Sequence, residues 1–267
     1  MKKYLSVFRI RFIHSFQYRA AALAGVATQF AWGFMEILAF RAFYASDPAA
    51  FPMEFHELVS YIWLQQAFLA VTALWFFDAD IFEAISSGGV AYELARPMNL
   101  YFMWFAKNCG TRLSRALLRC VPVLAVAFAL PKPWGVSLPP DFMTFVCFLI
   151  SMALAFFVVV ALVMLVYVIT LRSISPLGPR YFLGAISELL AGATIPLPFF
   201  PDKLRAIVEL LPFASGQNAP LRIYSGNLAG AEMAQAMLMQ LFWAIALTAG
   251  GMLWLRASEK KLVVQGG

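Results

Sequence analysis

The sequence predicts an all-α protein that crosses a membrane several times, and two observations carry this prediction. Of its 267 residues, 62% are apolar and 13% are charged, whereas soluble domains contain about 25% charged residues. The charges are also unevenly distributed, because six apolar segments hold only 5 of the 34 charged side chains. These segments cover 135 residues: 20–40, 58–77, 110–130, 142–171, 181–200 and 233–255. A bilayer needs about 20 apolar residues for each helical span, so we expect six transmembrane helices.

Residues 1–19 form the first predicted element, an interfacial helix in the cytoplasmic headgroup layer. An aromatic residue recurs at every fourth position, from Tyr4 to Phe16, among basic residues, as expected of a helix lying on a membrane. A plain cytoplasmic extension of the first span is the alternative. The rest, 20–267, is one transmembrane domain, with spans expected at about 20–43, 57–77, 110–130, 142–171, 181–200 and 232–255.

The region between spans five and six differs from the other connections. Segment 181–200 ends in a proline-rich stretch, and the apolar pieces that follow it are too short to span a bilayer. Non-helical backbone at membrane depth is tolerated only where protein or water satisfies its polar groups. We therefore expect short re-entrant helices within 196–226.

The distribution of Lys and Arg predicts the orientation of the chain. Six spans place both termini on one side, and that side carries 15 Lys and Arg residues against 5 on the other. Because cytoplasmic loops carry the excess of positive charge, both termini are expected in the cytoplasm. This topology accounts for the net charge of +6 without a nucleic-acid partner. Cys109, Cys120 and Cys147 lack paired spacing, so neither a disulfide framework nor a metal site is expected.

Two stretches carry recognisable detail. The cytoplasmic one, 85–97, contains Gly88-Gly89 and ends in Arg96-Pro97. The outer one, beginning at 191, contains the prolines and phenylalanines of 196–201 and 212–213. Together with the ending 260–267, they resemble the membrane subunit of a bacterial type 2 ABC exporter, of the group that pairs with a second permease and a separate ATPase.

The resemblance implies an assembly in the bacterial inner membrane. Two six-span subunits would face each other, each resting on an ATPase subunit, with 81–110 as the coupling segment and 196–226 as the outer gate. The second permease would be a different chain, with a second copy of this chain as the alternative. The implied ATPase-coupling residues are Ile85, Ser86, Ser87, Gly88, Gly89, Tyr92, Leu94, Arg96 and Pro97. The implied gate residues are Pro196, Phe199, Phe200, Pro201, Pro212 and Phe213.

The chain itself is not expected to be an enzyme. It contains no G-x-x-x-x-G-K-[ST] sequence that would cradle phosphates, and no catalytic or metal-ligating set at helical spacing. We therefore expect no cofactor on this chain, with ATP and Mg²⁺ on the partner ATPase. An ordinary loop is the alternative to a coupling helix at 85–97.

Two acidic residues, Glu36 and Glu188, lie inside predicted spans. An acid at bilayer depth costs at least about 2.5–3.5 kcal/mol, and such residues often mark a transport pathway. The hypothetical substrate pathway comprises Gln29, Glu36, Gln65, Gly184, Glu188 and Gly192, the two glycines lying at i−4 and i+4 of Glu188. It would favour cationic or amphipathic cargo. A structural hydrogen bond between helices, or a carboxyl group kept protonated by burial, is the alternative.

The leading functional prediction is a permease subunit that forms half of the membrane pathway of an ATP-driven exporter. A secondary transporter or channel driven by an ion gradient is the alternative, although no inverted repeat is visible. A membrane enzyme acting on lipid-linked substrates is a third possibility, which lacks a polar catalytic cluster. Nothing in the sequence identifies the cargo.

Overall fold

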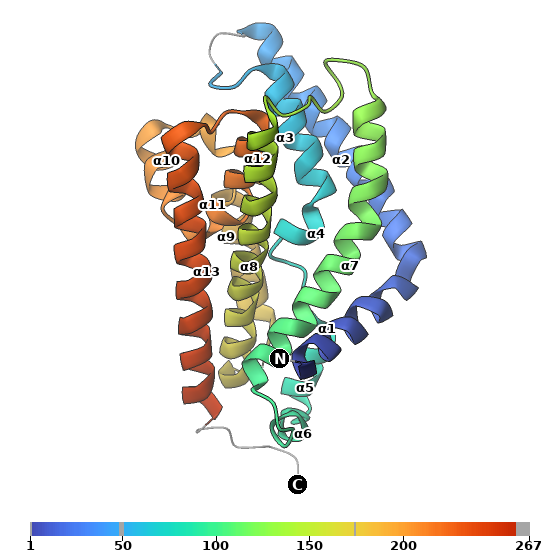
Figure 1. The fold of residues 1–267 in the computed structure, drawn as a ribbon, viewed down its shortest axis with the longest axis vertical. Helices are drawn as coiled ribbons and strands as arrows, with labels where there is room; N and C mark the ends of the chain where they lie inside the picture. Colours follow the sequence, from blue (N-terminus) through green and yellow to red (C-terminus); the bar gives the residue numbers. More distant parts are fainter. Residues whose placement is uncertain (1, 48–50, 174, 260–267) are drawn as a thin grey trace.

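The computed structural model describes residues 2–47, 51–173 and 175–259, and these residues form helices and no strand. The predicted all-α fold class is therefore confirmed. The helices make an elongated bundle, with short helices gathered at both of its ends (Figure 1). The chain ending 260–267, part of the family resemblance, lies outside the described residues.

The N-terminal helix α1 (Lys2–Ser15) packs along helix α7 (Leu100–Ala129) at the lower end of the bundle (Figure 1). A short 3-10 turn, η1 (Phe16–Tyr18), then joins it to α2 (Arg19–Ser46). The backbones of α1 and α7 approach closely, since a Cβ placed on Gly110 of α7 would lie 2.6 Å from the carbonyl oxygen of Phe8 in α1. Glycine at this position is what permits the contact.

The second predicted span is interrupted. It consists of α3 (Phe55–Ala67) and a single turn, α4 (Leu69–Thr72), with a break at Phe68. Arg112 of α7 is fully buried beside this break, and its Nη1 donates to the carbonyl oxygens of Ala70 and Ala73 at 3.2 and 2.8 Å. A charged donor satisfies carbonyls that the end of a helix leaves unpaired.

The two longest central helices are α7 and α8 (Phe142–Ser173), of 30 and 32 residues. Helix α7 begins ten residues before the expected span because Asn99 caps it, its side chain accepting from the Phe102 amide at 3.2 Å. Helix α8 occupies the centre of the bundle. Its residues 158–163 are all buried, and it packs against α7, α12 (Asn218–Ser225) and α13 (Gly230–Glu259).

The fifth apolar segment is not one continuous helix. Helix α9 (Leu177–Leu190) contains 14 residues, about 21 Å at 1.5 Å per residue, which is shorter than a bilayer core of about 30 Å. The helix ends before Gly192, whose φ of +75° belongs to the left-handed region that glycine adopts at helix C-termini. The expected stripe of Gly184, Glu188 and Gly192 on one helix is therefore corrected, because Gly192 lies in the turn.

Between α9 and α13 the chain forms the expected short helices. They are η3 (Leu197–Phe199), α10 (Asp202–Glu209), α11 (Pro212–Gly216) and α12. Helix α10 lies at the upper end of the bundle, and α11 and α12 lie against α8 (Figure 1). Most residues of 214–224 are buried, so α11 and α12 are surrounded by protein rather than by lipid.

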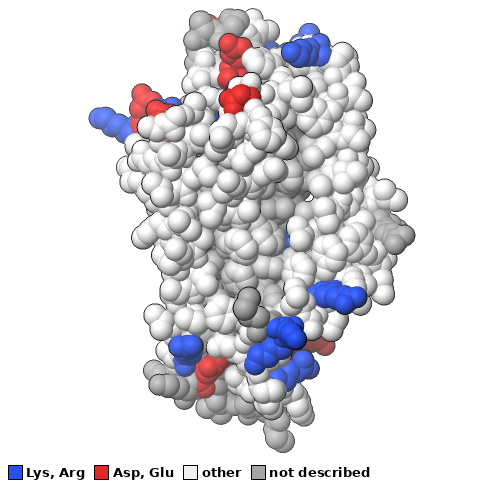
Figure 2. Space-filling model, in the orientation of Figure 1, with Lys and Arg blue, Asp and Glu red and all other residues white. Residues whose placement is uncertain are grey.

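Charge is distributed as in a membrane protein. The middle of the face seen in Figure 2 is almost free of charged side chains, and Lys and Arg gather toward its lower end. Within the described residues, three helices are long and apolar enough to cross a membrane by length and composition: Ala22–Ser46, Phe142–Ser173 and Gly230–Glu259. The first residue of α1 and the last residue of α13 lie at the same lower end (Figure 1).

Candidate functional site: a coupling surface and a polar pathway

The predicted coupling segment, 81–110, contains the start of α7, the short helix α6 (Val90–Leu94) and most of α5 (Ala79–Ser86). The two short helices lie at the lower tip of the molecule (Figure 1). Ile81, Phe82 and Val90 anchor them in the core. Gly88 makes the turn between them with a φ of +77°, whereas Gly89 has an ordinary negative φ. The exposed residues of the predicted set are Ser86, Ser87, Tyr92, Leu94, Arg96 and Pro97, and Ile85, Gly88 and Gly89 are half-buried.

Tyr92 stands out on this surface, because 82% of its area is exposed at the tip. Its neighbour Glu93 points inward and accepts a hydrogen bond from Trp104 Nε1 at 2.5 Å. Glu93 also forms an ion pair with Lys107, whose side chain is 11% exposed. Helix α6 therefore exposes one face, with Tyr92, and packs the other against α7 through Glu93.

Further contacts fix the coupling segment to the rest of the fold. On one side, the Lys3 ammonium donates to the Pro97 carbonyl oxygen, and the Asn99 amide donates to Tyr4 Oη at 3.0 Å. On the other, the Asp78 amide donates to the Tyr167 hydroxyl at 2.7 Å. Helices α1, α7 and α8 therefore hold the segment in one position.

A polar cluster connects α2 and α3 near the middle of the bundle. Gln29 is buried, and its Nε2 donates to the Gln66 carbonyl oxygen at 2.7 Å. Glu36 shares a side-chain hydrogen bond with Gln66. One carboxylate oxygen of Glu36 and the amide oxygen of Gln29 are buried without a hydrogen-bond partner among the described residues. The structure thus brings Gln29 and Glu36 together around Gln66.

The other predicted pathway residues lie around the end of α9. Gln65 Nε2 donates to the Ala193 carbonyl oxygen at 2.7 Å, and Tyr61 Oη donates to that of Gly192 at 3.1 Å. Gln65 and Gly192 therefore join α3 to the turn after α9. Gly184 faces open space, since a Cβ there would meet no atom within 4 Å. Glu188 is half-buried one turn further along the helix.

The predicted gate residues lie in and around η3 and at the start of α11. Phe199 lies between Phe40 of α2 and Phe51, with ring centroids 5.4 and 5.7 Å away. Pro196 and Pro212 are buried, Phe200 and Phe213 are half-buried, and Pro201 is exposed at the start of α10. The contact between Phe40 and Phe199 attaches the proline-rich stretch to α2.

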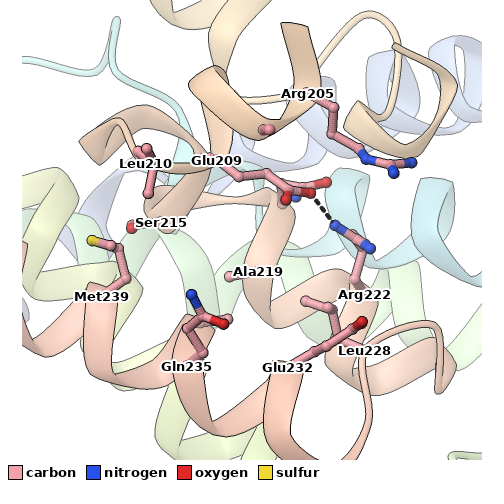
Figure 3. Close-up of a pocket in the computed structure, with 14 residues that line it drawn as sticks. Arg205, Glu209, Leu210, Ser215, Ala219, Arg222, Leu228, Glu232, Gln235 and Met239 are labelled. Carbon is pink, nitrogen blue, oxygen red and sulfur yellow. Dashed lines mark hydrogen bonds and ion pairs between the residues drawn. The ribbon is translucent and has the colours of Figure 1, made fainter. Parts of the chain in front are cut away.

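A pocket of about 390 Å³ lies between α10, α12 and α13. Glu209 and Arg222 point toward each other in it and form an ion pair, whereas Glu232 and Gln235 of α13 line its other side (Figure 3). Arg222 also donates to Asn227 at 2.7 Å. Most of the charge in this pocket is thus neutralised internally, and the ion pair connects α10 to α12.

Sequence reasoning missed one buried network that positions these helices. Gln240 of α13 is completely buried, accepts from the Ser151 hydroxyl at 2.8 Å and donates to the Ser215 carbonyl oxygen at 2.9 Å. It therefore joins α13 to α8 and α11. A glutamine in an uncharged predicted span was the available signal, because a buried amide needs partners.

The polar residues described above mainly make contacts between helices. Among the residues described, no group of three or more His, Cys, Asp or Glu side chains is placed to hold a metal ion. The fold and the apolar belt define an integral membrane protein built of helices.

Comparison with known proteins specifies that class. The sequence model of the ABC-2 family transporter proteins matches residues 30–263. The chain therefore belongs to the ABC-2 transporter family, in agreement with the predicted resemblance, and is a membrane permease that works with an ABC ATPase. A search of curated proteins gives no match.

Proposed function

We propose that this chain is the permease subunit of an ATP-driven exporter in a bacterial inner membrane, and that α5 and α6 are its contact with a separate ATPase. The observation that carries the proposal is the exposed tip around Tyr92 on a segment fixed to three helices. A push on a fixed segment moves the helices to which it is attached. ATP and Mg²⁺ would be bound by the partner, and this chain would contribute no catalytic group.

The membrane pathway in this proposal forms between this chain and a second permease, of a different sequence. Two observations support an interface along α2 and α9. Helix α2 exposes the large apolar side chains of Trp32, Met35 and Leu38, and Gly184 of α9 faces open space. Glu36 and Glu188 would then face the cavity between the subunits and favour cationic or amphipathic cargo, while the helices between η3 and α12 would close it on the outer side.

Truncation of the exposed tip tests the ATPase contact. We expect Tyr92→Ala to weaken co-purification of the ATPase about tenfold or more, because aromatic side chains at the centre of an interface contribute about 2 kcal/mol or more. The melting temperature of the isolated permease should stay unchanged, since Tyr92 packs little within the chain. Tyr181→Ala is the matched control, being 74% exposed but outside the coupling segment.

Equal ATPase retention by Tyr92→Ala and Tyr181→Ala would count against the coupling role of α6.

Reconstitution decides between the proposal and an ion-driven transporter. Proteoliposomes that contain the permeases without the ATPase should not transport, and transport driven by an ion gradient alone would contradict the proposal.

A further inference from the structure

A second cavity, of about 340 Å³, lies near the lower end between α1, the start of α2, the 76–80 linker and α7. We call it the α1–α7 pocket. Its volume is within the range of about 300–1,000 Å³ that is common for ligand sites. Its charged lining consists of Arg11, Asp78, Asp80, Arg115 and Arg119, accompanied by His14. The coupling and pathway contacts described above do not use the two arginines of α7.

The acidic residues of the α1–α7 pocket are already engaged by Arg11. Its Nη1 lies 2.5 Å from an oxygen of Asp80, and its Nε lies 4.0 Å from Asp78. Asp78 also caps α5, its side chain accepting from the Asp80 amide at 3.1 Å. Burial raises the pKa of Asp78, an effect that Arg11 offsets only in part. Three arginines and two aspartates thus give the charged lining a net positive charge, and among the described residues both aspartates lie against Arg11 and not against the α7 arginines.

Arg115 and Arg119 lie one turn apart on the same face of α7. Their guanidinium carbons are 5.9 and 5.6 Å from the Phe76 ring centroid, and neither forms an ion pair with any described residue. The Nε of Arg119 is shielded from solvent and has no hydrogen-bond partner in the described part of the chain. Like charges at this spacing repel each other, so the pair would gain from a shared anion.

We propose that the α1–α7 pocket binds the phosphate of an anionic phospholipid from the cytoplasmic leaflet, with Arg115 and Arg119 as its ligands. Guanidinium groups bind phosphate with paired hydrogen bonds, and basic pockets between membrane helices on the cytoplasmic side suit anionic headgroups. The walls fit an amphiphile, because Ala22 and Leu118 line the cavity beside the arginines. This site is independent of the proposed ATPase contact and requires only the orientation given by the positive charges.

The test is lipid binding to the purified full chain in detergent, measured by native mass spectrometry. The wild type should bind phosphatidylglycerol more tightly than phosphatidylcholine. The double substitution Arg115→Gln with Arg119→Gln should weaken phosphatidylglycerol binding about tenfold and leave phosphatidylcholine binding unchanged. Arg115→Lys with Arg119→Lys should keep only part of the preference, because lysine retains the charge and loses the paired hydrogen bonds. Arg256→Gln, at an exposed arginine near the end of α13, is the matched control and should behave as wild type.

Two results would overturn the assignment. One is an unchanged preference for phosphatidylglycerol in the double Gln variant. The other is displacement of the lipid by millimolar inorganic phosphate, which would identify a site for a soluble phosphate instead. If the double variant does not fold, each single Gln variant removes one ligand and should weaken binding about threefold, and an unaltered preference in both would equally reject the lipid site.

Discussion

Single residues decide where the helices of this protein end. Arg112 donates hydrogen bonds to carbonyl oxygens at and just after the end of α4. Gly192, with its positive φ, forms the turn that follows α9. Both residues were visible in the sequence, yet their roles differ from expectation. Arg112 is one of the 15 Lys and Arg residues on the side expected in the cytoplasm, but it is 2% exposed because the broken second span offers it four carbonyl oxygens. Its position depends on that tertiary break, which hydropathy does not show.

Gly192 gives a prediction at the residue scale. We expect Gly192→Ala to destabilise the protein by about 1–2 kcal/mol, because an alanine is strained at a φ of +75°. The added Cβ would also lie 3.1 Å from Tyr61 Oη and 3.2 Å from the Leu197 amide nitrogen. Thermal unfolding in detergent measures the effect. Gly184→Ala is the control, and it should leave stability unchanged or raise it, because this helical position is open and alanine favours helix. Equal stability of the two variants would contradict this account.

At the scale of elements, the long helices were easier to predict than the short ones. The uncharged run 142–171 predicted α8 within two residues, because nothing in it interrupts a helix. The start of α7 at Leu100 was missed, since Lys107 and Asn108 lie below the apolar part of that helix. The contacts of α6 were also beyond prediction. Glu93 and Lys107 are 14 residues apart, and the connection between α6 and α7 together with the course of α7 brings them together.

The Glu93–Lys107 pair supplies the prediction for this element. Glu93→Gln leaves the Lys107 ammonium in a largely buried site without its counter-charge, and removing one partner of a buried pair costs about 3–5 kcal/mol. We therefore expect a clear drop in the melting temperature. The double variant Glu93→Gln with Lys107→Met should recover part of that loss. Strictly additive effects of the two single substitutions would show that the pair does not fix α6 to α7.

At the scale of the whole molecule, composition predicted the class and the charges predicted an orientation. The family match establishes a permease, and α1 begins and α13 ends at the same end of the bundle (Figure 1). The proposed pathway could be predicted only in part. Gln29 and Glu36 meet around Gln66, whereas Gly184 faces open space and Glu188 is half-buried one turn away on α9.

Orientation is tested by accessibility in intact cells. A cysteine introduced by Tyr92→Cys should resist a membrane-impermeant maleimide until the cells are opened, because the tip is expected in the cytoplasm. Lys203→Cys on exposed α10 should react in intact cells. Wild-type protein gives the background, since it carries the buried Cys109 and Cys120 and the half-buried Cys147. Labelling of Tyr92→Cys from outside would reverse the proposed topology.

The backbone contact between Phe8 and Gly110 has a mechanical consequence. Because no side chain separates the Phe8 and Gly110 backbones, α1 has no room to slide or rotate over α7. Helix α1 also holds the chain just before α7 through the hydrogen bonds of Lys3 and Tyr4. Helix α1, which the sequence predicts to lie at the membrane surface, and the proposed coupling helices α5 and α6 would therefore move together. Thinning or stretching of the surrounding bilayer would tilt α1. The tilt would then change the angle at which α5 and α6 meet the proposed ATPase partner.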